Sequence, residues 1–368
     1  MDPKTTESRN PVESIASEYA DAVRQGKNLS VDAIAEANPE YESELRELLP
    51  LITHLERARQ TQQQRPAGLA TLGASRPEQL GDFQLVRQIG RGGMGVVFEA
   101  VQQSLGRRVA LKVLPKTLLS NDEQLRRFEH EARTAAALHH TNIVPVFGVG
   151  QDHGFHYFVM QRIDGHGLDA LLENSSVVLT PRQVAKLGVQ AASALDYAHD
   201  QQVLHRDIKP ANLLVNDRLD LWITDFGVAK ALEAEAVTRT GDVVGTLRYM
   251  APEQVVGEAD IRSDIYSLGV TLYELLAGRP AVDDSSIRQA IVARRPISSP
   301  PPLRQLNPEV PVDLETILQT AMSNDPAARY QNAGVFQQDL EAFLSGNAIS
   351  VRRVPLHERI QRWGKRNP

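Results

Sequence analysis

The stretch V-L-H-R-D-I-K-P-A-N-L-L-V, residues 203–215, is followed thirteen residues after its Asn by D-F-G at residues 225–227. Within it, Asp207 can accept a proton from a hydroxyl group, and Lys209 can steady a phosphate group. Asn212 and the Asp of D-F-G offer oxygen ligands, which suit a hard cation such as Mg²⁺. These four side chains fit a single reaction.

The eight-position pattern H-R-D-x-K-x-x-N, followed at this distance by D-F-G, resembles the signature of the protein kinase family. D-F-G alone arises by chance in many chains, whereas the longer pattern is specific. The resemblance implies an α+β, two-lobed protein kinase fold, with a small β-rich lobe that holds one key helix and a larger, mostly helical lobe. It also implies that Asp207 and Lys209 are catalytic, that Asn212 and Asp225 hold Mg²⁺, and that ATP is the phosphate donor.

Composition sets broad limits on the chain. It has 368 residues, 42% of them hydrophobic, and a net charge of -6, which fits one large or two medium globular domains. Cys is absent, so disulfides and thiolate metal sites are excluded, and a reducing, cytoplasmic location is expected. No leading apolar run and no long uncharged apolar stretch occurs, so we expect neither a secretory signal nor a membrane span.

Four regions follow from the pattern of residues along the chain. Residues 1–64 predict a short helical extension, with twelve acids against seven bases, Ser30 as an N-cap, and Asn38-Pro39 starting a further helix. Its role is either protein interaction or simple stabilisation. Residues 65–81 predict a flexible linker, residues 82–345 the kinase domain, and residues 346–368 a basic tail.

A glycine-rich segment, G-R-G-G-M-G at residues 90–95, lies between two stretches of β-prone residues. Glycine lets the backbone approach phosphate groups closely. A dinucleotide-binding loop would need a helix next, but Val96 to Val101 predicts a strand, so the kinase interpretation is favoured.

Lys112 stands between apolar neighbours in R-V-A-L-K-V-L and therefore needs an anionic partner. The resemblance implies that it binds the ATP phosphates and pairs with a Glu of the next helix, predicted over Leu125 to Leu138. Glu131 is our choice and Glu129 the rival. The family spacing favours Glu131, and the two face different sides of a helix.

The strand F-H-Y-F-V-M-Q-R-I-D-G resembles the connection between the lobes, with Met160 as gatekeeper and residues 161–163 as the hinge that binds adenine through its backbone. A Glu is common in the family where Gln161 stands. The resemblance assigns the nucleotide to Gly90, Arg91, Gly92, Gly93, Met94, Gly95, Val97, Ala110, Lys112, Met160, Gln161, Ile163 and Leu214.

Further matches lie downstream, where Pro181 to Asp200 predicts a long helix and residues 251–253 form A-P-E. Asp264 resembles the buried Asp that braces the catalytic loop, and Arg329 resembles the Arg that pairs with Glu253.

Two positions indicate the substrate class. Lys209 is typical of serine/threonine kinases, and so is Thr246, although Leu247 replaces the usual small residue or Pro. Within that class, the small lobe resembles eukaryotic-like (Hanks-type) bacterial members. A pseudokinase scaffold is the main alternative, but it requires a lost catalytic residue, and all four key residues are present. An active kinase whose N-terminal module serves as an adaptor stays open.

Arg206, directly before Asp207, implies activation by phosphorylation, and the resemblance therefore predicts autophosphorylation at Thr238 and Thr240. We expect protein substrates, self-association for this reaction, and no nucleic-acid partner. In the tail, Leu356, Ile360 and Trp363 share one helical face amid six basic residues. This segment either binds anionic membrane at its inner face, just before a transmembrane helix in a longer chain, or is a solvated tail.

Overall fold

The computed structural model describes residues 15, 19, 22, 30–42, 45, 46, 49, 78–92, 95–114, 122–173, 178–226, 248–283 and 300–351. They belong to two compact units, the N-terminal region and the remainder of the described chain. Gly93, Met94, Thr238, Thr240, Thr246, Leu247, residues 352–368 of the predicted tail and most of the predicted linker lie outside the described residues.

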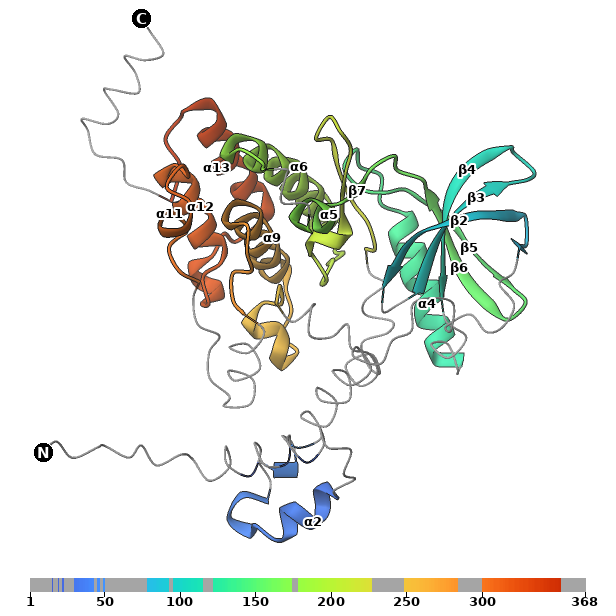
Figure 1. Ribbon diagram of the computed structural model, residues 1–368, viewed down its shortest axis with the longest axis horizontal. Coiled ribbons are helices and arrows are strands. Elements are labelled where there is room, and N and C mark those ends of the chain that lie inside the picture. Colours follow the sequence, from blue (N-terminus) through green and yellow to red (C-terminus); the bar gives the residue numbers. More distant parts are fainter. Residues whose placement is uncertain are drawn as a thin grey trace, which may run out of the picture. The chain divides into compact units, whose positions relative to one another are not determined.

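The small lobe (Figure 1) is built on an antiparallel sheet of six strands, whose order is β1-β2-β3-β4-β6-β5. Its strands are β1 (Gln79–Leu80), β2 (Phe83–Gly92), β3 (Gly95–Gln102), β4 (Arg107–Leu114), β5 (Val146–Asp152) and β6 (Phe155–Gln161). Branched and aromatic side chains from these strands form one buried cluster that includes Val96, Phe98 and Leu111. The predicted strand-glycine-strand unit is the β2–β3 hairpin.

One helix, α4 (Asp122–Ala136), accompanies this sheet, close to the predicted span. Phe128 is buried, and its ring lies 4.6 Å from that of Phe158 on β6. This aromatic contact, made edge to face, packs the helix against the sheet.

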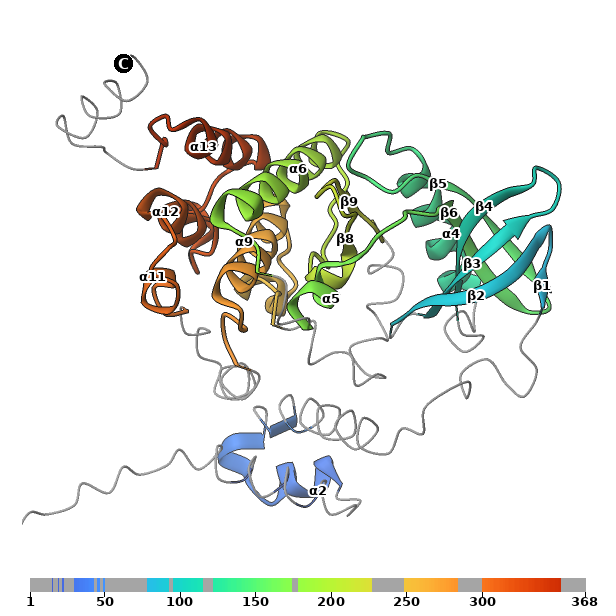
Figure 2. The ribbon, with the colours of Figure 1, turned by 45° about the horizontal axis from the view of Figure 1, so that its top comes forward.

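The large lobe contains the helices α5 (Leu168–Glu173), α6 (Pro181–Asp200), α9 (Ile261–Ala277), α11 (Leu303–Leu306), α12 (Val312–Ala321) and α13 (Ala333–Ser345). The helix α6 begins as predicted, because Thr180 and Gln183 form a capping box and Pro181 occupies the first turn. Figure 2 shows α6 beside α9 and α13. Gly188 allows this packing, since a Cβ there would lie 2.8 Å from Leu272 and 2.9 Å from Leu340.

Three short strands, β7 (His166–Gly167), β8 (Leu213–Val215) and β9 (Leu221–Ile223), form a second sheet in that order. The 3₁₀ turns η3 (Pro210–Asn212), η4 (Pro252–Val256) and η5 (Pro326–Ala328) complete the lobe. The loop that carries Asp207 and Lys209 leads into η3, which contains Asn212, and Asp225 follows β9.

The N-terminal unit contains α2 (Val31–Glu36) and the 3₁₀ turn η1 (Pro39–Tyr41). Ser30 caps α2 as predicted, because its Oγ accepts a hydrogen bond from Ala33 N at 3.4 Å. Four buried side chains form a small core of their own: Tyr19, Ala35, Leu45 and Leu49. Among the described helices of both units, none is long and apolar enough to cross a membrane.

Candidate active site

One buried carboxylate, that of Asp264 on α9, binds two consecutive N–H groups of the loop after α6. Its Oδ1 accepts a hydrogen bond from Arg206 N at 2.7 Å, and its Oδ2 accepts one from His205 N at 2.9 Å. Burial alone would raise the pKa of Asp264, but the hydrogen bond and charge of His199 and the backbone hydrogen bond from His205 hold that pKa below its ordinary value. Asp264 is therefore an ionised brace, and Arg206 is fixed at a φ of 68°.

Sequence reasoning missed His199, whose Nε2 lies 2.9 Å from Asp264 Oδ2. Its position in the last turn of the predicted helix, six residues before His205, was the available signal. His205 itself links two loops. Its Nδ1 accepts from Asp207 N at 3.2 Å, so Nε2 carries the proton and donates to Thr224 O at 2.8 Å.

Asp207 lies in a partly enclosed position with its two carboxylate oxygens in different surroundings. Its Oδ2 is 2.8 Å from Lys209 Nζ and accepts from Asn212 Nδ2 at 3.0 Å. The same amide donates to Asp207 O at 2.7 Å, which fixes the loop against itself. Within the described part of the chain, Asp207 Oδ1 is buried and has no hydrogen-bond partner. One oxygen is thus held while the other is left for an external donor.

Lys112 and Asp225 meet from opposite lobes. Lys112 Nζ donates to Asp225 Oδ2 at 2.7 Å, and the side chain of Lys112 is 7% exposed. Burial raises the pKa of Asp225, but the charge and hydrogen bond of Lys112 outweigh it, so the pKa stays below the ordinary value. Asn212 is beside this pair, because its O accepts from Thr224 N at 3.0 Å. The structure thereby brings Asp207, Lys209, Asn212, Lys112 and Asp225 together.

The helix α4 carries both residues that were considered as partners of Lys112. Glu131 belongs to α4, but its side chain lies outside what the structure describes. The rival Glu129 has its Oε2 3.8 Å from Arg133 Nη2. Burial lowers the pKa of His156, and the charge of Glu129 opposes that shift. For Lys112, the described ion pair is the one with Asp225.

The predicted nucleotide residues of the small lobe share one face of the sheet. Lys112 is paired with Val97, and Ala110 with Met160, and directly opposite residues of antiparallel strands point to the same side. Because Ala110 is two residues from Lys112, all four lie on the face that carries the Lys112–Asp225 pair. Val97 and Ala110 therefore lie where the sequence placed the roof of an adenine site.

The glycine-rich residues predicted to contact the nucleotide lie where β2 ends and β3 begins. Gly90, Arg91 and Gly92 end β2, and Gly95 opens β3. Gly95 has a φ of 151°, and a Cβ there would collide with the carbonyl oxygen of Val113.

The hinge and the floor of the predicted adenine site come from other segments. Gln161 ends β6, and its N–H donates to Pro145 O at 2.9 Å. Ile163 follows in chain without regular secondary structure, and Leu214 lies in β8.

Behind Met160 lies a small pocket between α4 and the D-F-G segment. It is lined by apolar residues together with Thr224 and Asp225, and Thr224 Oγ1 lies 3.9 Å from Met160 Sδ. The sequence did not predict this pocket, since its walls come from four separate segments.

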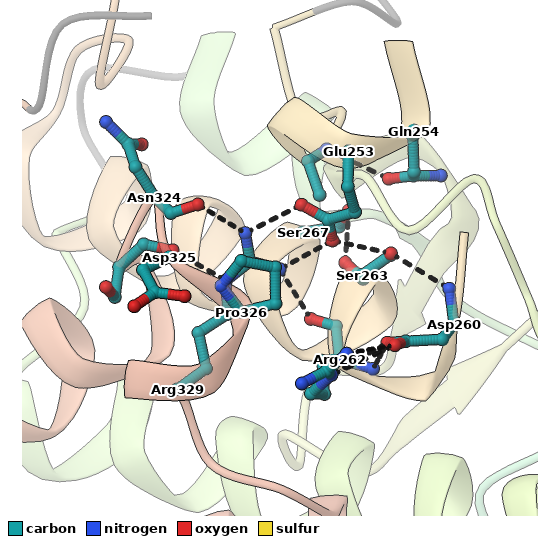
Figure 3. Close-up of polar contacts among 12 residues, drawn as sticks. Glu253, Gln254, Asp260, Arg262, Ser263, Ser267, Asn324, Asp325, Pro326 and Arg329 are labelled. Carbon is teal, nitrogen blue, oxygen red and sulfur yellow. Dashed lines mark hydrogen bonds and ion pairs between the residues drawn. The ribbon is translucent and has the colours of Figure 1, made fainter. Parts of the chain in front are cut away.

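The A-P-E motif is anchored to the large lobe by the predicted pair of Glu253 and Arg329 (Figure 3). Arg329 Nη1 and Nη2 donate to Glu253 Oε1 and Oε2 at 2.6 and 2.8 Å. Ser263 Oγ adds a bond to Oε1 at 2.7 Å, and the guanidinium lies 4.8 Å from the Tyr266 ring centroid. Burial raises the pKa of Glu253, but the bonds from Arg329 and Ser263 keep it below the ordinary value.

Comparison with known proteins gives one family. The model of the protein kinase domain matches residues 83–340. The serine/threonine-protein kinase PrkC of Bacillus subtilis is 35% identical over 76% of this chain and 43% of its own length. The serine/threonine-protein kinase PknA of Mycobacterium tuberculosis is 40% identical over 72% of this chain and 62% of its own length. This chain thus spans about half the length of these relatives.

Among solved structures, the PknI kinase domain of Mycobacterium tuberculosis is similar, with a TM-score of 0.58 and 29% identity. The match covers 74% of this chain and 99% of that one. The likeness therefore extends over both lobes described above.

Proposed function

Because the chain belongs to the protein kinase domain family, we propose that it transfers the γ-phosphoryl group of ATP to Ser and Thr hydroxyl groups of proteins. The observation that carries this proposal is the unpartnered, buried Oδ1 of Asp207. A buried carboxylate oxygen without a donor is costly, and a substrate hydroxyl would satisfy it.

The described residues fit ATP and Mg²⁺. Asn212 and Asp225 supply oxygen donors from adjoining loops, and among the described residues no cluster of three or more His, Asp or Glu could hold a metal by itself. Mg²⁺ usually takes one or two carboxylates and completes its shell with water and phosphate oxygens, so a two-residue site is appropriate. Bound there, Mg²⁺ would offset negative charge on the phosphates.

The reaction then follows from what each side chain can do. Asp207 accepts the substrate hydroxyl proton on Oδ1, while its Oδ2 stays on Lys209 and Asn212. Lys209, a cation beside the base, stabilises charge on the transferred group. Lys112, whose ammonium already holds the Asp225 carboxylate, orients the phosphates from the opposite lobe.

Other side chains complete the proposed site. Gly90, Arg91, Gly92, Gly93, Met94 and Gly95 cover the phosphates, and Glu131 supports Lys112 from α4. The adenine lies between Val97 and Ala110 above and Leu214 below, with Met160 behind it and the backbone of Gln161 and Ile163 at the hinge.

Regulation is the second part of the proposal. Thr238 and Thr240 are the autophosphorylation sites, and Arg206 binds the phosphate. In support, Arg206 has a fixed backbone, since its N–H is held by Asp264 and its O accepts from Gln254 Nε2 at 3.1 Å. The reaction between two copies of the chain would require transient self-association.

Location is the third part. We infer that the kinase domain works in the cytoplasm and that the basic tail either contacts anionic lipid at the inner face of the membrane or is solvated. The first residues of the predicted tail, which the structure describes up to Val351, are held to the large lobe. Ser350 N and Oγ donate to Asp339 at 2.7 and 2.9 Å.

A direct experiment tests the central proposal. The purified chain is incubated with Mg²⁺ and ³²P-labelled ATP in the presence of a general protein substrate, and phosphorylated residues are mapped by mass spectrometry. We expect phosphate on Ser and Thr. No incorporation by a chain that binds ATP, or incorporation on Tyr alone, would contradict the proposal.

A further inference from the structure

A buried carboxylate outside the catalytic loop, that of Glu99, forms ion pairs with more than one arginine. Glu99 on β3 is 0% exposed, and three arginines surround it. Its Oε1 bonds to Arg108, while Oε2 lies 2.8 Å from Arg87 Nη2 and 3.3 Å from Arg162 Nε. The contacts to Oε2 are ion pairs rather than aligned hydrogen bonds.

Glu99 lies on the cleft face of the sheet. It is paired with Ala110 on β4 and is two residues from Val97, so its side chain points to the side that carries Lys112. Along this face the order from the phosphate end is Lys112, then Ala110 and Glu99. Glu99 therefore marks the end of the cleft nearest the hinge.

The three arginines differ in their exposure and in the segments from which they come. Arg87 and Arg108 extend from strands of the same sheet, and their side chains are 59% and 67% exposed. Arg162 comes from the hinge, between Gln161 and Ile163, and its side chain is 22% exposed. An exposed arginine can exchange its partner for water, whereas the shielded Arg162 depends more on the buried carboxylate.

Glu99 also keeps its charge in this position. Burial would raise the pKa of Glu99, but the Arg108 hydrogen bond and the charges of Arg162 and Arg87 keep it below the ordinary value. Arg162 makes a second ion pair with Asp164, at 3.2 Å, farther along the hinge. The hinge is thus attached to the small lobe by a charged side chain at its centre.

We propose that Glu99 is a positioning residue for nucleotide binding, which holds Arg162 and thereby fixes the hinge backbone beside the adenine site. This inference rests on the proposed function of the cleft as an ATP site. It predicts that Glu99 acts on affinity for ATP and not on the chemical step, because Asp207 and Lys209 belong to a separate loop.

The test compares Glu99→Gln and Arg162→Gln with the matched control Arg108→Gln, which removes a cation from the same carboxylate but not from the hinge. Calorimetry gives the Kd for Mg-ATP, and steady-state kinetics give KM and kcat. We expect each of the first two variants to raise Kd and KM about tenfold, a loss comparable to one charge-assisted contact. The control should stay within about twofold, and kcat should be unchanged in all three.

Two further variants separate positioning from general stability. Glu99→Gln/Arg162→Gln should bind ATP no more weakly than Glu99→Gln alone, because both changes break one link. Arg162→Lys should restore part of the affinity, since it keeps a cation at the hinge. Thermal melting identifies any variant that fails to fold. If Glu99→Gln is unfolded, the ATP affinity of Arg162→Gln alone tests the inference.

The outcomes are distinguishable from failure of the proposed function. Unchanged ATP affinity in Arg162→Gln would overturn the inference, and so would an equal loss in Arg108→Gln. Transfer that is absent while wild-type ATP binding is intact would contradict the proposed function alone. A wild-type chain that binds no ATP would overturn both.

Discussion

Asp264 is the residue on which the geometry of the catalytic loop depends. Its two oxygens accept from consecutive backbone N–H groups, His205 and Arg206, and no neutral amide can do the same. In Asp264→Asn one N–H would face an NH₂ group. We expect kcat to fall roughly 10- to 100-fold because Asp207 is misplaced, while the KM for ATP changes little.

Steady-state kinetics with ATP as the varied substrate measures this effect. His199→Gln, which changes only the other neighbour of Asp264, is the matched control and should have the smaller effect on kcat. A rise in KM at constant kcat in Asp264→Asn would show that the brace serves nucleotide binding instead.

At the same scale, sequence reasoning identified residues whose role depends on local spacing and missed those defined by distant contacts. The catalytic-loop residues lie within a few positions of one another, so their meeting follows from the chain itself. Lys112 was expected to need an anion, but Asp225, 113 residues away, could not be chosen from periodicity. Glu99 was detectable as a charge at an inward-facing strand position, two residues from Val97, but its three arginines come from different segments.

At the scale of elements, the buried ion pair between Arg329 and Glu253, which anchors η4, is expected to contribute to the free energy of unfolding. Arg329 is buried and donates to both oxygens of Glu253. Arg329→Met should lower the free energy of unfolding by about 3 kcal/mol, because it leaves a carboxylate without its cation. The control Arg262→Gln removes an outer ion pair with Asp260 and should cost less than about 1 kcal/mol. Urea unfolding measures both.

The same anchor gives a pH dependence. The folded-state pKa of Glu253 lies below its ordinary value, so its stabilising contribution is present above about pH 4.3 and is lost as pH falls below that range. The difference in unfolding free energy between wild type and Glu253→Gln should therefore shrink in acid. A difference that grows in acid would contradict the assignment.

Element boundaries were predictable where capping signals stand in the sequence. The helix predicted from Pro181 begins there, where the structure shows a capping box of Thr180 and Gln183, and Ser30 is the N-cap of α2 that the sequence predicted. The helix expected after Asn38 begins as a 3₁₀ turn with Pro39 in its first position. Pro favours a first turn but does not determine whether that turn is α or 3₁₀.

The proposed switch lies in the segment between D-F-G and A-P-E, residues 228–250, which contains Thr238 and Thr240. If Thr238 and Thr240 carry the activating phosphates, the double variant Thr238→Ala/Thr240→Ala should show no gain in activity after preincubation with ATP, whereas the wild type should accelerate. The initial rates of substrate phosphorylation before and after preincubation measure this. Full activation of the double variant would exclude these residues as the switch.

At the scale of the whole molecule, the tail is the remaining charged feature. Val351 packs against the core of the large lobe and Ser350 is held by Asp339, so removal of residues 352–368 should leave the domain folded. If the tail binds membrane, the full chain should co-sediment with anionic but not neutral vesicles, and less so at high salt. Equal binding of the truncated chain, or no preference between lipids, would favour a solvated tail.

The central claim is that Asp207 is the catalytic base, and Asp207→Asn tests it most directly. The amide keeps the size of the side chain but cannot accept the substrate proton. We expect phosphate transfer to protein to fall by roughly 10²- to 10⁴-fold. The calorimetric Kd for Mg-ATP and the melting temperature should stay near those of the wild type. Transfer at a near-normal rate by Asp207→Asn would contradict the account.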